Sequence, residues 1–182
     1  MALMEEVRSI RYAVRQANAG DAEAISVVGS TTFARAYGAI VRPEDMAEYL
    51  ERMFDPLQIA LEIKHSRAIY FVAEDEKQVL GYAKLMVTTT PRLLPDKGFI
   101  ELVRLYVDAN HYGKGIGERL LSAARSKAVA SGYSGWWLRV WEKNEGAIRF
   151  YQHHGFATVG SEPYLIGETA NPVALMFEAL QS

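Results

Sequence analysis

Three glycines at alternate positions, Gly113, Gly115 and Gly117, separate an apolar run that ends at Val107 from a segment with helical spacing. An ordered glycine costs about 0.5–1 kcal/mol of extra backbone entropy, so this spacing indicates that the backbone must be bare there. A strand, a glycine loop and a helix in that order leave N–H groups unpaired at the positive end of a helix dipole. Such groups bind anions, most often phosphate, and Lys114 adds a positive charge. We therefore expect a phosphate site; a plain glycine-rich turn is the alternative.

Two common phosphate-binding motifs fit the loop poorly. A Walker A loop reads G-x-x-x-x-G-K-S/T, whereas Lys114 is followed by Gly115. A dinucleotide fingerprint reads G-x-G-x-x-G with an acid about 20 residues later. Glu142 could supply that acid, but the loop spacing is G-x-G-x-G, and the 65 residues after Gly117 are too few to complete a dinucleotide domain. A dinucleotide-dependent oxidoreductase stays an alternative function.

Another pattern matches better, in three segments. "LYVDANHYGKGIGERLL" resembles the acetyl-CoA-binding motif of the GNAT superfamily of N-acetyltransferases, Q/R-x-x-G-x-G/A, with Gly115 and Gly117 on its two small positions. Tyr112 stands where that motif has Gln or Arg. "WEKNEGAIRFYQHHGF" resembles the second signature of the family, an Asn with a Tyr seven residues later and then Gly-Phe, and "FIELVRLYV" resembles its central strand. Weaker similarity in "PEDMAEYLERMF" and in the last strand extends to bacterial polyamine acetyltransferases of the PaiA type.

The resemblance implies acetyl-CoA as co-substrate. The implied cofactor-binding residues lie in the central strand, the glycine loop and the following helix: Leu105, Tyr106, Val107, Tyr112, Gly113, Lys114, Gly115, Ile116, Gly117, Asn144, Ala147 and Tyr151. Main-chain groups of the central strand would contact the pantetheine arm. Asn144 also suits a second role, as the N-cap of the helix that begins there.

Acetyl transfer to an amine imposes chemical requirements. The amine, with a pKa of about 10.4, must lose a proton, the carbonyl oxygen must be stabilised, and the departing thiolate should gain a proton. The chain has no cysteine for an acyl-enzyme and no G-x-S-x-G elbow, which favours direct attack in a ternary complex. Glu101 is the predicted base: it lies in an apolar strand, matches the catalytic glutamate of histone-type relatives, and burial would raise its pKa. The alternatives are an exposed strand edge or a pair with Arg104.

Tyr151 is the predicted acid, because a phenol can give its proton to a thiolate and the resemblance places it there. A core tyrosine is the alternative. Phe33 and Tyr37, four residues apart on one helix, together with Glu101, are the predicted acceptor-binding residues, although a core aromatic pair fits equally well. His111, His153 and His154 lack metal-ligand spacing, so we expect no metal.

Composition is consistent with an ordinary soluble protein. The chain has 182 residues, 49% of them hydrophobic, and a formal net charge of −2, which argues against nucleic acid as the main partner. There is no apolar run of about 20 residues and no signal-peptide pattern, so we expect no membrane partner and a cytoplasmic location. We expect a single domain over 1–182, with 1–9 as a loose tail, that acts as a monomer or homodimer.

The apolar patterns predict a mixed fold. Strands are expected at 10–15, 68–75, 79–89, 99–107 and 135–141 and in "FATVG" and "PVALMFEAL", and helices after Asp21, in "RPEDMAEYLERMF" and "PLQIALEIKHS", at 115–130 and at 145–154. This order favours an α/β (α+β) fold, a mixed and mostly antiparallel sheet of about seven strands with helices on both faces. The function expected is acetyl-CoA-dependent acetylation of a primary amine, such as a polyamine. The alternatives are a non-catalytic acyl-CoA sensor and acetylation of a protein N-terminus or lysine.

Overall fold

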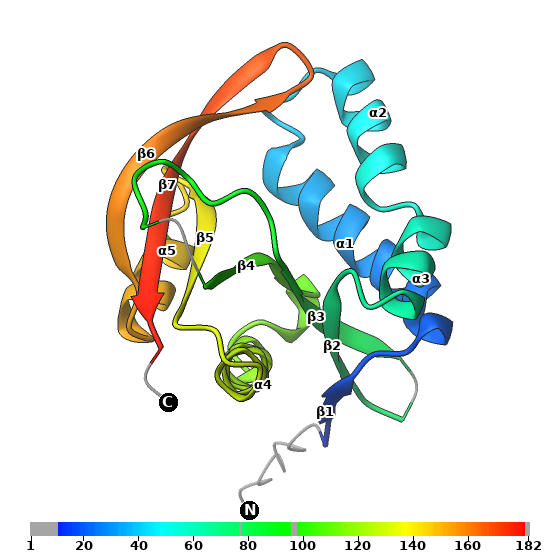
Figure 1. The fold of residues 1–182 in the computed structure, drawn as a ribbon. Coiled ribbons are helices and arrows are strands. Elements are labelled where there is room, and N and C mark those ends of the chain that lie inside the picture. Colours follow the sequence, from blue (N-terminus) through cyan, green and yellow to red (C-terminus); the bar gives the residue numbers. More distant parts are fainter. Residues whose placement is uncertain (1–10, 77, 96–97, 181–182) are drawn as a thin grey trace, which may run out of the picture.

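The structure is a computed structural model that describes residues 11–76, 78–95 and 98–180, so the predicted tail 1–9 lies outside the described residues. Figure 1 shows the elements. Their order is β1 (Ala13–Gln16), α1 (Ala22–Tyr37), α2 (Pro43–Met53), α3 (Pro56–Lys64), β2 (Ile69–Glu74), β3 (Val79–Met86), β4 (Phe99–Val107), α4 (Ile116–Ala130), β5 (Gly135–Trp141), α5 (Glu145–His153), β6 (Ala157–Ile166) and β7 (Thr169–Ala179). Short 3-10 turns at Ala19–Asp21 and Ala109–His111 precede α1 and the glycine loop.

The strands form one seven-stranded sheet in the order β1-β2-β3-β4-β5-β7-β6. Every neighbouring pair is antiparallel except β4 and β5, which are parallel. The apolar strand β4 occupies the middle of the sheet, as its composition predicts. The predicted mixed, mostly antiparallel sheet is therefore confirmed.

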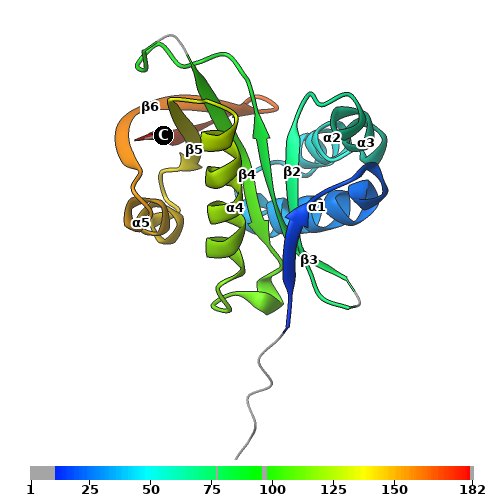
Figure 2. The ribbon, with the colours of Figure 1, turned by 60° about the horizontal axis from the view of Figure 1, so that its bottom comes forward.

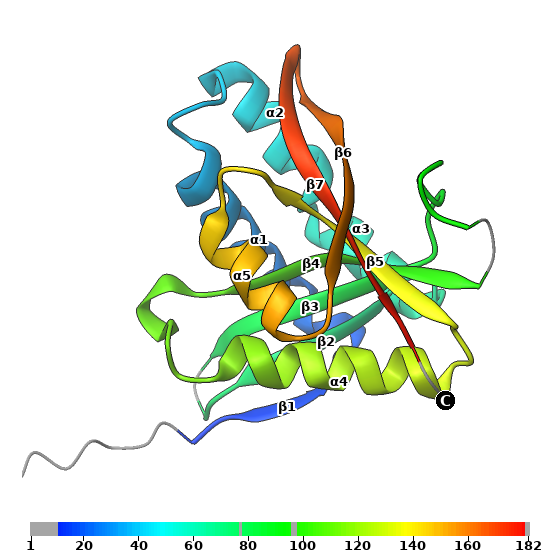
Figure 3. The same ribbon diagram turned by 90° about the vertical axis from the view of Figure 1, so that its left-hand side faces the viewer.

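Helices cover both faces of this sheet (Figure 2). On one face α4 packs Leu120 and Ala124 against Leu85 of β3, and α5 adds Ile148 to the same apolar cluster. On the other face α1 packs Ile25 against buried side chains of β2 and β3. Figure 3 shows α4 crossing the sheet in front while α1, α2 and α3 lie behind it. The apolar stripes of α1, α4 and α5 thus face the sheet, as their periodicity predicts.

The two central strands pair over only a short length. Phe99–Glu101 of β4 pairs with Gly135–Trp137 of β5, and the strands then diverge. Beyond this point β4 pairs only with β3, and β5 only with β7. The main-chain groups of β4 after Glu101 consequently face an opening in the sheet on the β5 side.

A bulge in β4 sets which side chains face each way. Lys84 of β3 lies opposite Arg104 and Leu85 opposite Leu102, so Val103 is the extra residue. Side chains alternate along a strand, but one extra residue shifts that alternation. Glu101 and Arg104 therefore lie on the same face of the sheet, the face that α1 covers.

None of the helices in the described ranges is long and apolar enough to cross a membrane.

Candidate active site

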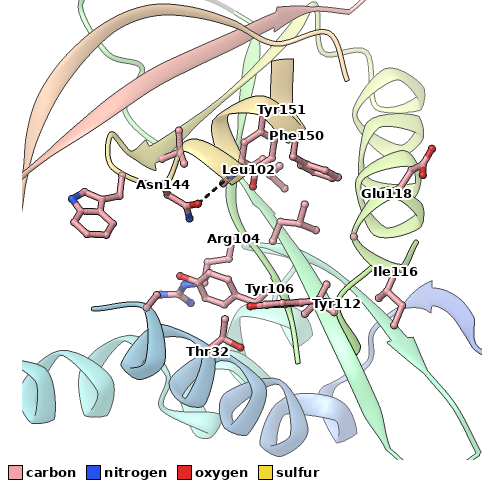
Figure 4. A pocket seen from close by; sticks show the side chains of 18 of the residues that line it. Thr32, Leu102, Arg104, Tyr106, Tyr112, Ile116, Glu118, Asn144, Phe150 and Tyr151 are labelled. Carbon is pink, nitrogen blue, oxygen red and sulfur yellow. Dashed lines mark hydrogen bonds between the residues drawn. The ribbon is translucent and has the colours of Figure 1, made fainter. Parts of the chain in front are cut away.

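A cavity of about 720 Å³ opens where β4 and β5 diverge. Its wall joins the middle of the sheet to the glycine loop and to helices on both faces (Figure 4). Of the twelve residues implied for cofactor binding, all but Lys114 line it: Leu105, Tyr106, Val107, Tyr112, Gly113, Gly115, Ile116, Gly117, Asn144, Ala147 and Tyr151. The sequence segments that carry the family resemblance thus meet at one place in the fold.

The glycine loop leaves open space at the start of α4. Gly113 and Gly115 have left-handed backbones, with φ of 74° and 75°, which a residue with a side chain adopts only at a cost. A Cβ atom built on Gly113 would meet nothing within 4 Å. Gly115 is the N-cap residue of α4 and supplies no side-chain cap, so the first turn of the helix is left to bind an external acceptor. This arrangement fits the phosphates of a cofactor.

Lys114 does not contribute its charge to the cavity wall. Its ammonium group donates a hydrogen bond to the carbonyl of Asn110 at 3.0 Å, and its own carbonyl accepts one from the Tyr12 hydroxyl at 3.3 Å. Both contacts hold the loop in shape. The positive potential at the glycine loop therefore comes from the amide groups and the dipole of α4 rather than from this side chain.

Helix α5 presents the predicted acid to the cavity. The Oδ1 atom of Asn144 accepts a hydrogen bond from the Ala147 amide at 3.1 Å, which caps the helix as predicted. Phe150 and Tyr151 then point into the cavity (Figure 4). Burial raises the pKa of Tyr151, and the Tyr37 hydroxyl raises it further. The phenol is thus protonated at neutral pH and can donate a proton.

Glu101 is buried and paired, but not with Arg104, the partner that the sequence suggests. Its carboxylate accepts hydrogen bonds from Thr88 Oγ1 at 2.5 Å and from Arg139 at 2.7 Å. Arg139 lines the cavity, whereas Glu101 lies behind it and is not on the wall. Arg139 also forms an ion pair with Glu162 at 2.5 Å. Glu101 can therefore reach the cavity only through these neighbours or through water.

Tyr37 and Phe33, the predicted acceptor-binding pair, differ in whether they reach the cavity. Tyr37 lines the cavity and lies between Phe33, at 4.5 Å between ring centroids, and Trp141, at 5.6 Å. Phe33 itself is buried in the core, 4% exposed, and stacks on Tyr49. Phe33 therefore packs against Tyr37 and is not itself on the cavity wall.

Several wall residues were not predicted from the sequence. Trp141 lines the cavity, and so do Thr32, Arg104, His111, Arg139 and His154. Phe150 could have been found, because it lies beside Ala147 and Tyr151 on the predicted helix. Within the described ranges, no three His, Asp or Glu side chains come together in a way that could hold a metal ion.

Comparison with known proteins agrees with this geometry. The acetyltransferase (GNAT) family matches residues 33–156, more than half of the chain. A protein named an uncharacterized N-acetyltransferase in the pepI 3′ region of Lactobacillus delbrueckii subsp. lactis is 29% identical over 153 residues, covering 84% of this chain and 88% of that protein. An uncharacterized N-acetyltransferase of Mycobacterium tuberculosis is 27% identical over 147 residues, covering 81% and 90%.

Solved structures show the same fold. The PaiA N-acetyltransferase from Thermoplasma acidophilum, in complex with coenzyme A, has a TM-score of 0.75 at 20% identity and covers 93% of this chain and 99% of its own. The structure of yncA from Salmonella typhimurium with its cofactor acetyl-CoA has a TM-score of 0.66 at 20% identity, with 93% and 94% covered. The resemblance read from the three sequence segments is confirmed at the level of the family: this chain belongs to the acetyltransferase (GNAT) family and is an acyltransferase enzyme.

Proposed function

We propose that this enzyme transfers the acetyl group of acetyl-CoA to a primary amine on a small molecule. The observation that carries the proposal is the cavity itself, which runs from the glycine loop through the opening between β4 and β5 to α1. The cofactor phosphates would bind at Gly113–Gly117. The pantetheine arm would lie along β4, where main-chain groups have no strand partner on the β5 side and can bind an extended chain. The acceptor would enter beside Tyr37.

Two side chains supply the proton transfers in this proposal. The amine nitrogen attacks the thioester carbonyl, the C–N bond forms, and the C–S bond breaks. Tyr151 gives its phenolic proton to the leaving thiolate. The amine proton passes to Glu101 through water, because Glu101 lies behind the cavity wall and is held by Thr88 and Arg139. Holding both substrates in one cleft supplies most of the rate enhancement.

The acceptor class has several candidates. The resemblance to acetyltransferases of the PaiA type, whose fold this chain shares, favours a polyamine, and a protein N-terminus or a lysine side chain also presents a primary amine. A non-catalytic acyl-CoA sensor would need the glycine loop and Asn144 but would not need a proton donor at Tyr151. The presence of a protonated phenol on the wall supports an enzyme over a sensor.

One plate assay tests the proposal. Thermal unfolding is measured with and without acetyl-CoA, and free thiol release is then followed against a panel of amines that includes spermidine and a peptide with a free N-terminus. A ligand at 100 times its dissociation constant adds about 2.7 kcal/mol to the free energy of unfolding. Stabilisation with amine-dependent thiol release supports the proposal. Stabilisation without release from any amine supports the sensor, and protection by NAD(P)H with none from acetyl-CoA supports an oxidoreductase.

A further inference from the structure

A buried arginine on the acceptor side of the cavity has no anionic partner. Arg104 is 6% exposed and lines the cavity. Among the described residues it forms no ion pair with any Asp or Glu, and its guanidinium instead lies 4.3 Å from the centre of the Phe54 ring. An arginine side chain is always charged in proteins. A buried charge without a counter-charge is costly, so this position calls for an anion from outside the chain.

The other neighbours of Arg104 offer it no free anion. Lys84, opposite Arg104 on β3, is a second cation, and its 2.7 Å ion pair occupies the carboxylate of Glu62. Tyr82, Tyr106, Tyr49 and Tyr70 surround the guanidinium, and burial raises the pKa of each hydroxyl. None of these phenols is ionised at neutral pH. The aromatic rings therefore stabilise the charge of Arg104 through cation–π contacts, but they supply no negative charge to balance it.

The second arginine of the cavity wall, Arg139, does have anionic partners. Arg139 is held by two carboxylates, Glu101 and Glu162, so that this group of three side chains has a net charge of −1, from one positive and two negative charges. The acceptor side thus combines an unbalanced positive charge at Arg104 with a negative group around Arg139. An ammonium and a carboxylate on one small molecule would match both.

The phosphates of the cofactor are not the missing anion. The bulge at Val103 turns Arg104 toward the face that α1 covers. The glycine loop opens α4, which covers the other face. Figure 4 shows the Arg104 side chain extending toward α1, on the same side as Thr32 and Tyr106, while Ile116 and Glu118 lie at the start of α4 on the far side of the cavity.

We infer that the acceptor carries a carboxylate that binds Arg104, so that the substrate class is a small amino acid rather than a polyamine. This inference rests on the proposed acetylation of an amine and specifies its acceptor. The planar guanidinium presents paired N–H donors that match the two oxygens of a carboxylate. A polyamine could place one ammonium beside the negative group around Arg139, but it has no anion for Arg104, and a second ammonium near Arg104 would be repelled by that like charge.

The test compares acceptors that differ only in the carboxylate. Thiol release from acetyl-CoA is measured with α-, β- and γ-amino acids, with the carboxamide of each, and with the amine that lacks the carboxyl group. Spermidine is included as the polyamine. We expect kcat/KM for the best amino acid to exceed that of its carboxamide and its decarboxylated amine by about 100-fold or more.

Two variants connect that preference to Arg104. Arg104→Gln should reduce the ratio of kcat/KM between the amino acid and its carboxamide to about 1, and Arg104→Lys should give an intermediate ratio because the charge stays but the paired donors are lost. Arg52→Gln, an exposed arginine on α2 outside the cavity wall, is the matched control and should keep the wild-type ratio. Stabilisation by acetyl-CoA shows that each variant is folded and binds the cofactor.

The outcomes separate this inference from the proposed function. Release with spermidine or a decarboxylated amine that equals or exceeds release with every amino acid overturns the inference and leaves the acetyltransferase function intact. An unchanged ratio in Arg104→Gln also overturns it, because Arg104 would then be a structural charge in an aromatic setting. If that variant does not fold, the comparison of amino acids with their carboxamides and decarboxylated amines in the wild-type enzyme still tests the inference. No release from any acceptor overturns both proposals together.

Discussion

A pair of glycine substitutions can separate backbone strain from cofactor binding. Gly113 and Gly132 have nearly the same left-handed backbone, with φ of 74° and 81°, and a Cβ atom on either would meet nothing within 4 Å. Gly113 lines the cavity, whereas Gly132 follows the end of α4 and does not. Gly113→Ala and Gly132→Ala therefore impose the same conformational change, and only the first places a methyl group where we expect the cofactor phosphates.

The expected magnitudes follow from these two features. An alanine forced into the left-handed region costs about 1 kcal/mol or somewhat more, so each variant should melt about 2–4 °C below the wild type. At Gly113 the methyl group also disrupts charge-assisted hydrogen bonds to phosphate, each contributing about 1.5–3 kcal/mol, which corresponds to a dissociation constant at least about tenfold weaker. At 100 times the wild-type dissociation constant, stabilisation by acetyl-CoA should then fall from about 2.7 to about 1.4 kcal/mol or less in Gly113→Ala.

The measurement is thermal unfolding of both variants with and without acetyl-CoA, together with the KM for acetyl-CoA. Gly132→Ala should keep the full stabilisation and the wild-type KM. Full stabilisation of Gly113→Ala would show that the loop does not hold the phosphates. An equal loss in both variants would show that reduced stability, and not the added methyl group, weakens binding.

Three further outcomes follow from single contacts. Tyr151→Phe should lower kcat by about 100-fold or more while acetyl-CoA still raises the melting temperature; unchanged turnover would remove the acid assignment. Glu178→Ala leaves the buried Trp136 Nε1–H, which donates to Glu178 at 2.6 Å, without its acceptor and should cost about 1–3 kcal/mol in chemical denaturation, most of which Glu178→Gln should restore. Hydrogen bonds from Arg15 lower the pKa of Asp21 below 3.8, so the stability they provide is present above that pH and is lost as the pH falls through the lower, folded-state pKa. The difference in unfolding free energy between wild type and Asp21→Asn should therefore shrink below about pH 4, and a constant difference from pH 7 to pH 3 would contradict the assignment.

The central elements were predictable because each carries a strong local signal. The apolar run of β4 marks a strand buried on both faces, and the glycine loop and α4 follow it directly. The last two strands were predicted too short. β6 extends to Ile166 and β7 begins at Thr169, and Pro163 lies opposite Pro172 within the ladder. Prolines in a sequence argue against a strand. Pro163 is tolerated because β6 is the edge strand, where some N–H positions need no partner, and Pro172 of β7 lies just beyond Val173, the last residue paired with β5.

The charge balance of the site depends on pairings that no local pattern reveals. Two residues three apart in a regular strand face opposite ways, and the bulge at Val103 puts Glu101 and Arg104 on the same face. They still do not pair, because the parallel register of Glu101 with Trp137 brings Arg139 from β5 to the carboxylate. That distant contact takes up the nearby negative charge and leaves Arg104 without a partner. The unpaired charge of Arg104, which specifies the acceptor in our proposal, thus depends on a bulge in β4 and on the pairing of β4 with β5, and neither can be predicted from the local sequence. The cofactor loop, in contrast, is built from adjacent residues and can be recognised in the sequence.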